Sequence, residues 1–304
     1  MDINKFTPKN KLKNTSIKKL TDISIEDIYE ILYSAKLLKN KLLAKEPHNN
    51  LKNKTIAILN MTPSKKSVFS LEMSIRQMGG ECVYFSEAKE KYGSILDTAN
   101  IIKNYGIDGA VVFANEQSEI EEFERISKIP TITGLTSFSN PCQVLSDLFT
   151  IWEFKGKLSG LKIAYLGSDT NTASSLLIGG VKCGMDICFA CPKGFEPNNI
   201  IREKAMQYGE YTITNNPLEA IKNADIVYTD KWPENENPDK FLPFRINSEI
   251  FSKAKPDALF MHPLPAKRGI EVTTEIIDGV CSLIYPQAEN KLHTEKAIFS
   301  LLIK

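Results

Sequence analysis

The stretch "TPSKKS" at residues 62–67 places hydroxyl and ammonium groups where a short apolar run gives way to a helical pattern. The first backbone N–H groups of a helix have no partner within it, and the positive end of the helix dipole lies there. Ser64, Lys66 and Ser67 add donors and positive charge, a combination that suits phosphate or another small anion. The same residues also fit a plain helix start, with Ser64 as N-cap beside solvated lysines.

A second candidate is the loop "FMHPLPAKRG" at residues 260–269, in which a histidine is followed by two prolines and a basic pair. His262 could donate a hydrogen bond to a carbonyl oxygen, and Arg268 could hold an anion through its two-pronged guanidinium. A single histidine is also common as a structural residue, so this alternative stays open. His293, in the last helical segment, is expected at a helix surface or an interface.

Two other sequence patterns argue against a bound cofactor. The turn in "YLGSDTNTASSLL" has one glycine where a dinucleotide fingerprint needs three, so a small polar substrate is a better match than NAD. Cys188 and Cys191 form a C-x-x-C inside a strand-like run with no second pair, which favours reduced, buried thiols. We therefore expect neither a metal ion nor an organic cofactor.

Composition narrows the class of protein. The chain has 304 residues, 42% of them hydrophobic and 25% charged, with a formal net charge of +1. This balance is typical of a soluble globular protein and gives no overall field for nucleic acid or a membrane surface. The polar N-terminal segment and the lack of a long apolar run predict a cytoplasmic protein without signal peptide or membrane span.

Strand-like and helical segments alternate along the chain, which predicts an α/β fold of two doubly wound parallel-sheet domains. We place one domain at 1–139, with the C-terminal helix 288–304 packing back on it, and the other at 140–287. The candidate motifs each follow a predicted strand, and ligands of parallel sheets collect beyond the carboxyl ends of strands. The sequence therefore predicts an active-site cleft between the domains.

Five segments, in this order, resemble the aspartate/ornithine carbamoyltransferase family, and its ornithine branch most closely. They are "GLTSFSNPCQVLSDLFTIWE", "LSGLKIAYLGSDTNTASSLL", "NADIVYTDKW", "HPLPAKRGIEVTTEIIDG" and "QAENKLHTEKAIF". The resemblance implies a carbamoyl phosphate domain, an amino-acid domain, and a homotrimer with active sites between subunits. It also implies transfer of a carbamoyl group to an amine, with phosphate as the leaving group and no cofactor.

The resemblance also implies roles for particular residues. The phosphate would be held at the start of the first candidate helix, and the carbamoyl group by the N-P-C-Q segment and the 262–269 loop. The second substrate would meet two polar residues of the second domain, and a loop with two lysines would reach the neighbouring subunit. The phosphate residues are Ser64, Lys65, Lys66 and Ser67, and the carbamoyl-group residues are Asn140, Gln143, His262 and Arg268. The residues for the second substrate are Asn171 and Asp230, and the lysines that reach the neighbouring subunit are Lys89 and Lys91.

Several positions depart from the family pattern. Where the family has S-T-R-T-R, the chain has S-K-K-S-V at residues 64–68. Lys65 therefore stands in place of a threonine, Lys66 and Val68 in place of the two arginines, and Ser67 in place of the second threonine. Phe113 stands where the family has an arginine, and Asn140 stands for the histidine of H-P-C-Q. Pro263 matches the aspartate-type loop, and "PENEN" replaces the S-M-G turn after Asp230. Lysine keeps the charge but not the planar fork of arginine, and phenylalanine cannot donate a hydrogen bond.

Three functions remain open from the sequence. The first is carbamoyl transfer from carbamoyl phosphate to an ornithine-like or other amine. The second is a catalytically impaired family member that serves as a binding or assembly protein, which Val68 and Phe113 favour. The third is recognition of a different phosphorylated or carboxylate ligand by a lysine-lined anion site.

Overall fold

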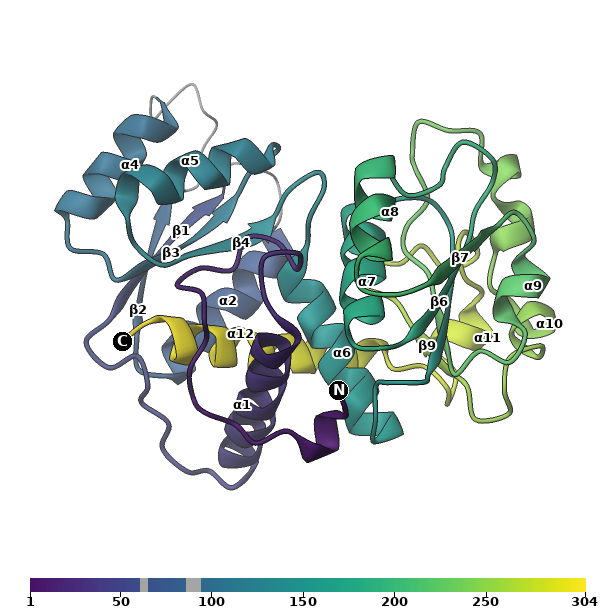
Figure 1. Cartoon of the computed structure of the whole chain (residues 1–304), viewed down its shortest axis with the longest axis horizontal. Helices are drawn as coiled ribbons and strands as arrows, with labels where there is room; N and C mark the ends of the chain where they lie inside the picture. The colour runs from purple at the N-terminus through teal and green to yellow at the C-terminus, as the bar shows by residue number, and fades with distance from the viewer. Residues whose placement is uncertain (61–64, 86–93) are drawn as a thin grey trace. The chain divides into compact units, whose positions relative to one another are not determined.

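A computed structural model of the chain describes residues 1–60, 65–85 and 94–304. The chain folds as two compact units, each built on its own parallel β-sheet with flanking helices (Figure 1). The first unit comprises Phe6–Phe149 and Asn290–Lys304, and the second comprises Met1–Lys5 and Thr150–Glu289. The predicted α/β class with two parallel sheets is confirmed, whereas the functional boundaries at 139/140 and 287/288 stay a prediction.

The first unit holds a four-stranded sheet of order β2-β1-β3-β4. Its strands are β1 (Thr55–Asn60), β2 (Glu81–Phe85), β3 (Gly109–Phe113) and β4 (Thr131–Leu135). Helices α4 (Ile95–Asn104) and α5 (Gln117–Ser127) cover one face, and α1 (Ile25–Leu43), α2 (Lys65–Gln77) and α12 (Ile284–Leu302) cover the other (Figure 1). Because both faces are covered, β1 and β3 are apolar along most of their length rather than alternating.

The second unit holds a five-stranded sheet of order β7-β6-β5-β8-β9. Its strands are β5 (Lys162–Leu166), β6 (Asp186–Ala190), β7 (Tyr211–Thr214), β8 (Ile226–Tyr228) and β9 (Leu259–Met261). Its helices are α7 (Asn171–Lys182), α8 (Asn199–Met206), α9 (Pro217–Ile221), α10 (Ser248–Phe251) and α11 (Thr274–Ile277), with short 3-10 turns at Ile3–Lys5, Pro238–Lys240 and Leu242–Phe244. Helix α6 (Pro141–Lys155), like α12, contributes residues to both units.

The C-terminal helix differs from its expected character. The pattern of its sequence predicts an amphipathic helix with His293 at a surface or interface, but in α12 the run His293–Phe299 is buried on every side within the first unit. The helix lies between other elements of that unit: Lys39 of α1 donates to Asn290 at 2.8 Å, and Ser70 of α2 donates to Glu295 at 3.1 Å. Over this run the helix has no solvent face, so the polar residues of the run are buried with it.

One aspartate at the start of each sheet fixes the two central strands against each other. In the first unit the backbone N–H of Asp108 donates to the carbonyl of Thr55 at 2.9 Å, and the Asp108 carboxylate accepts the N–H of Thr55 at 2.8 Å. In the second unit Asp225 makes the same two bonds with Lys162, at 2.9 and 2.8 Å. We call this reciprocal pair the aspartate clasp; it joins the amino ends of β1 and β3, and of β5 and β8.

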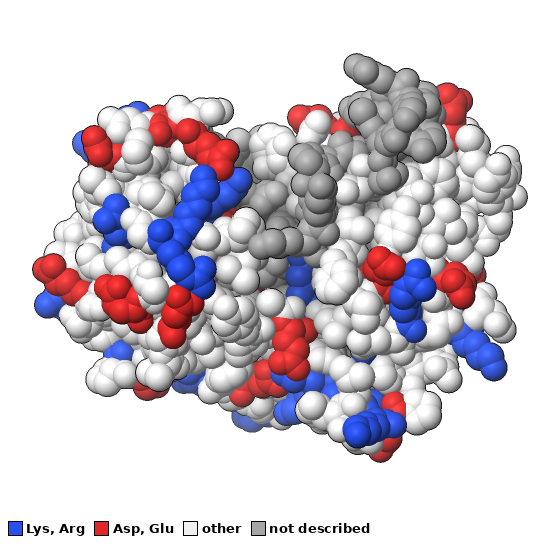
Figure 2. All heavy atoms as spheres, turned by 180° about the vertical axis from the view of Figure 1, so that it is seen from behind, with Lys and Arg blue, Asp and Glu red and all other residues white. Residues whose placement is uncertain are grey.

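The surface carries charges of both signs close together. On the face seen in Figure 2, basic and acidic side chains are interspersed rather than gathered in one field. Neighbouring pairs on helices and turns, such as Arg76 with Glu72 at 2.8 Å and Lys240 with Glu236 at 2.9 Å, contribute to this mixture. Exposed pairs of this kind stabilise a fold by about 1 kcal/mol at most, so the fold does not depend on them.

Over the ranges that the structure describes, no helix is both long enough and apolar enough to span a membrane.

The aspartate clasp predicts a large effect for a small truncation. Asp225→Ala removes an acceptor for the Lys162 N–H and a partner for the Lys255 ammonium, which lies 2.7 Å away. Because the Asp225 side chain is buried, we expect a loss of about 2–3 kcal/mol in the free energy of unfolding. Asp186→Ala, at an exposed position of β6 opposite Lys162, is the matched control and should change it by less than about 0.5 kcal/mol. Chemical denaturation measures both values; equal effects would show that the clasp contributes nothing special.

Candidate functional site

Each sheet has one topological switch point, where successive strands stop being added on one side of the first strand and continue on its other side. In the first unit this point lies between β1 and β3, and in the second between β5 and β8. Ligands of open parallel sheets bind beyond the carboxyl ends of the strands at such a point. The predicted segments 64–67, 167–171 and 229–230 all follow one of these four strands.

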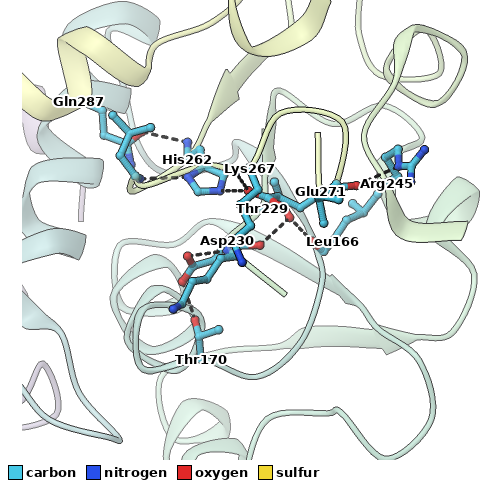
Figure 3. A network of polar contacts seen from close by, with 12 residues as sticks. Leu166, Thr170, Thr229, Asp230, Arg245, His262, Lys267, Glu271 and Gln287 are labelled. Carbon is cyan, nitrogen blue, oxygen red and sulfur yellow. Dashed lines mark hydrogen bonds and ion pairs between the residues drawn. The ribbon is translucent and has the colours of Figure 1, made fainter. Parts of the chain in front are cut away.

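In the second unit the structure brings two predicted residues to the same place. Thr170 is the N-cap of α7: its hydroxyl accepts the N–H of Ala173 at 3.0 Å and donates to Asp230 at 2.9 Å (Figure 3). The other carboxylate oxygen of Asp230 accepts the N–H of Lys231 at 2.8 Å. Asn171 is the first residue of α7 and follows directly on Thr170, which holds the Asp230 carboxylate.

This arrangement offers two opposite charges within a short span. The start of α7 presents the positive end of a helix dipole, which favours a carboxylate. The Asp230 carboxylate favours an ammonium group, and its hydrogen bonds to Thr170 and Lys231 fix its orientation. An amino acid carries both groups, so this end of the second sheet is suited to binding one.

His262 is wholly buried in the second unit, after the end of β9. Its backbone N–H donates to Gln287 at 3.0 Å, and its Nδ1 accepts the backbone N–H of Leu264 at 3.0 Å (Figure 3). Since Nδ1 accepts, the ring proton is on Nε2. Leu264 has a φ of 50°, in the left-handed region that a leucine seldom adopts, so the imidazole holds the loop in a strained conformation.

The other side of the imidazole faces Glu271, which is also wholly buried. Nε2 of His262 lies 3.3 Å from Oε1 of Glu271, within ion-pair distance but without hydrogen-bond alignment. The same carboxylate oxygen accepts the backbone N–H of Lys267 at 2.6 Å, which ties down the far end of the loop. Both imidazole nitrogens thus face groups of its own loop, so the geometry favours a positioning role for His262 over direct donation to a substrate.

Arg268 also has a partner within its own unit. Its guanidinium makes two hydrogen bonds to Asp278, at 2.8 and 2.6 Å, and these bonds lower the pKa of the Asp278 carboxyl. An anion would have to replace this carboxylate before Arg268 could hold it as predicted.

In the first unit, the predicted carbamoyl-side residues lie at the start of α6. Asn140 immediately precedes the helix, and the amide nitrogen of Gln143 donates to Asp147 at 2.9 Å, with both side chains buried. Cys142, also buried, directs its thiol toward the carbonyl of Thr133 at 3.5 Å, and burial raises its thiol pKa to about 12. Of the retained P-C-Q residues, Cys142 thus contacts β4 of the sheet, whereas Gln143 bonds to a residue one turn further along α6.

Phe113, at the end of β3, is engaged in packing. Its side chain is wholly buried, and a Cβ on Gly134 would lie 2.6 Å from three carbons of its ring. The pairing of β3 with β4 shifts at this point, so that Phe113 is opposite Leu135. The position at which the resemblance implies an arginine is therefore filled by an aromatic ring seated on a glycine.

Several predicted residues cannot be placed. Ser64, Lys89 and Lys91 lie outside the described residues, as do the side chains of Lys65, Lys66 and Ser67. Val68 follows them on α2 and is half-buried.

The cysteines behave as predicted for thiols in a core. Cys188 and Cys191 are buried and free, and burial raises the pKa of the Cys191 thiol to about 12. Within the described part of the chain, no group of three or more histidines, cysteines and carboxylates is placed to hold a metal ion.

Three residues of the site were not predicted from the sequence: Thr170, Glu271 and Gln287. Thr170 has a local signal, a threonine immediately before a helical pattern, which is typical of an N-cap. Glu271 and Gln287 lie nine and 25 residues after His262, and only the fold brings them to the imidazole and its backbone.

Two family models match this chain, one over each half. The model of the aspartate/ornithine carbamoyltransferase carbamoyl-P binding domain matches residues 15–153, and that of the Asp/Orn binding domain matches residues 159–302. The second match includes the end of α12, which in the structure packs with the first unit.

Individual relatives extend over nearly the whole chain. Ornithine carbamoyltransferase of Anoxybacillus flavithermus is 39% identical over 96% of this chain and 98% of its own, and that of Pyrococcus abyssi is 36% identical over 96% of both. The solved structure of ornithine carbamoyltransferase from Pyrococcus furiosus superposes with a TM-score of 0.92 at 36% identity, covering 95% of this chain and 96% of that one. The chain thus belongs to the aspartate/ornithine carbamoyltransferase family, as its motifs suggested.

Proposed function

We propose that this protein transfers the carbamoyl group of carbamoyl phosphate to the side-chain amine of an ornithine-like amino acid and releases phosphate. The observation that carries the proposal is the Asp230 carboxylate held by Thr170 at the start of α7, because it can bind the amine-bearing substrate and orient it. Family membership supplies the reaction class.

The reaction needs a nucleophilic amine, a polarised carbamoyl carbon and a stabilised leaving phosphate. Asp230 and Asn171 would hold the amino acid so that its neutral amine attacks the carbamoyl carbon. The C–N bond forms as the C–O bond to phosphate breaks, the electron pair leaves with phosphate, and the amine loses a proton to solvent. Ser64, Lys65, Lys66 and Ser67 would stabilise the departing phosphate at the start of α2.

The remaining predicted residues would act around the carbamoyl group. Asn140 can donate one amide hydrogen bond to its oxygen, and Gln143 would be held in position beside it by Asp147. His262 would hold the backbone of the 262–269 loop in place through Leu264 and Glu271. Arg268 would exchange Asp278 for an anion during the reaction cycle.

A second candidate function is favoured by one specific observation. Phe113 supplies no hydrogen-bond donor where the resemblance implies an arginine, and its ring is packed against Gly134. Removal of a single donor to a developing oxyanion typically slows a reaction by about 10²–10³-fold. A family member that binds carbamoyl phosphate, or a different phosphorylated or carboxylate ligand, without transfer is the corresponding alternative.

Anion binding tests the first half of the proposal. Titration calorimetry with carbamoyl phosphate and with inorganic phosphate should give saturable binding, and Lys66→Ala should weaken it by about tenfold because a charge-assisted contact is lost. Lys52→Ala, an exposed lysine of the same unit, is the control and should bind like the unmodified chain. Flat titrations of the unmodified protein with both ligands would rule out carbamoyl transfer.

Turnover tests the second half. With carbamoyl phosphate and ornithine we expect release of phosphate and formation of the carbamoylated amine. Asp230→Asn should lower kcat/KM for the amino acid by about 10²-fold, because it removes the charge that orients the substrate, while affinity for carbamoyl phosphate stays unchanged. Binding of carbamoyl phosphate with no turnover on ornithine, lysine, putrescine or aspartate would favour the binding-protein alternative.

We further propose a cytoplasmic homotrimer in which Lys89 and Lys91 reach the neighbouring subunit. Light scattering after gel filtration should then give about three times the chain mass of 34.1 kDa. A monomer at micromolar concentration would contradict this assembly.

A further inference from the structure

Helix α12 carries a buried carboxyl group that the proposed roles leave unused. The Glu295 side chain is 1% exposed; one of its oxygens accepts the Ser70 hydroxyl at 3.1 Å, and the other has no hydrogen-bond partner among the described residues. A buried carboxylate without full compensation is costly, so its neutral form is favoured. Burial raises the pKa of Glu295 to about 7.

The position of Glu295 relates it to the two helix starts of the first unit. Ser70, its hydrogen-bond partner on α2, lies five residues after Lys65, where that helix begins, which is about 7.5 Å along the helix axis. Cys142, the second residue of α6, lies close enough for the Glu295 charge to raise its pKa. Glu295 therefore contacts α2 little more than one turn after its start and lies near the start of α6, the two helices to which the phosphate and the carbamoyl group are assigned.

Few groups near Glu295 stabilise its negative charge. In the described part of the chain, Lys291 on α12 itself and the Ser70 hydroxyl on α2 lower the pKa of Glu295, and the Cys142 thiol on α6 lies within reach of its charge. Lys291 and Ser70 both favour the ionised carboxylate, yet burial outweighs them. A negative charge added at the start of α2 would add to the effect of burial, since like charges raise the pKa of a carboxyl group.

Resting on the function proposed above, we propose that Glu295 is a proton-linked positioning residue of the anion site, neutral when carbamoyl phosphate is bound and partly ionised when the site is empty. On binding, a proton from solvent bonds to the Glu295 carboxylate; on release of phosphate it returns to solvent. Two negative charges about 10 Å apart at an effective dielectric constant near 20 interact strongly enough to change an affinity by roughly tenfold or more. Affinity for the anion should therefore fall as the pH rises through neutrality.

Titration calorimetry of the full chain with carbamoyl phosphate, in PIPES, HEPES and Tris buffers at pH 7.5, measures the number of protons taken up. Near this pH the unmodified protein should take up about 0.5 proton more per site than Glu295→Gln, since the free carboxyl is then mostly ionised and the bound one mostly neutral. The difference should be near zero at pH 6, where the carboxyl is neutral in both states. Glu289→Gln, the same change at an exposed position of α12, is the matched control and should behave like the unmodified chain.

Two outcomes of this titration separate the two proposals. If the unmodified protein binds carbamoyl phosphate but takes up as many protons as Glu295→Gln, the proton linkage is wrong and the proposed function stands. If the unmodified protein binds nothing between pH 6 and pH 8, the proposed function fails, and the linkage fails with it.

The pH dependence of stability provides a second measurement that needs no ligand. The folded-state pKa of Glu295 lies above that of an unfolded glutamate, so its stabilising effect is present at low pH and is lost as the pH rises through about 7. Between pH 6 and pH 8, the unfolding equilibrium constant of the unmodified protein should rise by about tenfold relative to that of Glu295→Gln. Parallel pH profiles would mean that the carboxyl does not titrate in this range and would overturn the proposal.

Discussion

The two central strands of each sheet are joined at their amino ends by a single aspartate, and the rest of each unit depends on that junction. Asp108 and Asp225 each use both backbone and carboxylate to bind the first residue of the adjacent strand. Parallel strands have no hairpin to set their register, so a fixed point at one end determines where the other end lies. The carboxyl ends of the same strand pairs are where the chain changes direction and where the candidate ligand groups lie.

The units therefore share a construction but differ in the charge they offer. The second unit presents a carboxylate, Asp230, against the start of α7, a pairing that suits a zwitterion. The first unit presents the starts of α2 and α6, with the carboxyl of Glu295 buried near them. In the proposed function, positive helix ends near a titratable acid would make anion binding by this unit sensitive to protons as well as to side-chain charge.

Much of the fold could be predicted from the sequence. Alternating strand and helix patterns give the right class, and strands such as 55–60 and 162–166 are short apolar runs whose ends are marked by polar residues. The order of five motifs was enough to indicate the family. Periodicity failed at α12, because a helix enclosed by its own unit and an amphipathic surface helix can carry a similar density of polar residues, and only the packing distinguishes them.

The site was predicted less completely than the fold. Arg268 and His262 were singled out for their chemistry, but chemistry alone cannot indicate that Asp278 and Glu271 already face them. Glu295 gave no signal at all, since a glutamate in a helical run is ordinarily a surface residue. Such partnerships join residues far apart in the chain or turn a side chain inward, and both are set by tertiary structure.

The seat of Phe113 on Gly134 has an evolutionary consequence. The aromatic ring occupies the volume above a residue that has no side chain, so neither position can change independently. An arginine at 113 would leave the glycine uncovered and the guanidinium in an apolar setting, whereas a larger residue at 134 would collide with the ring. The residue tolerated at each of these positions therefore depends on the residue at the other, so placing a cation at this end of β3 would require coupled changes rather than one substitution.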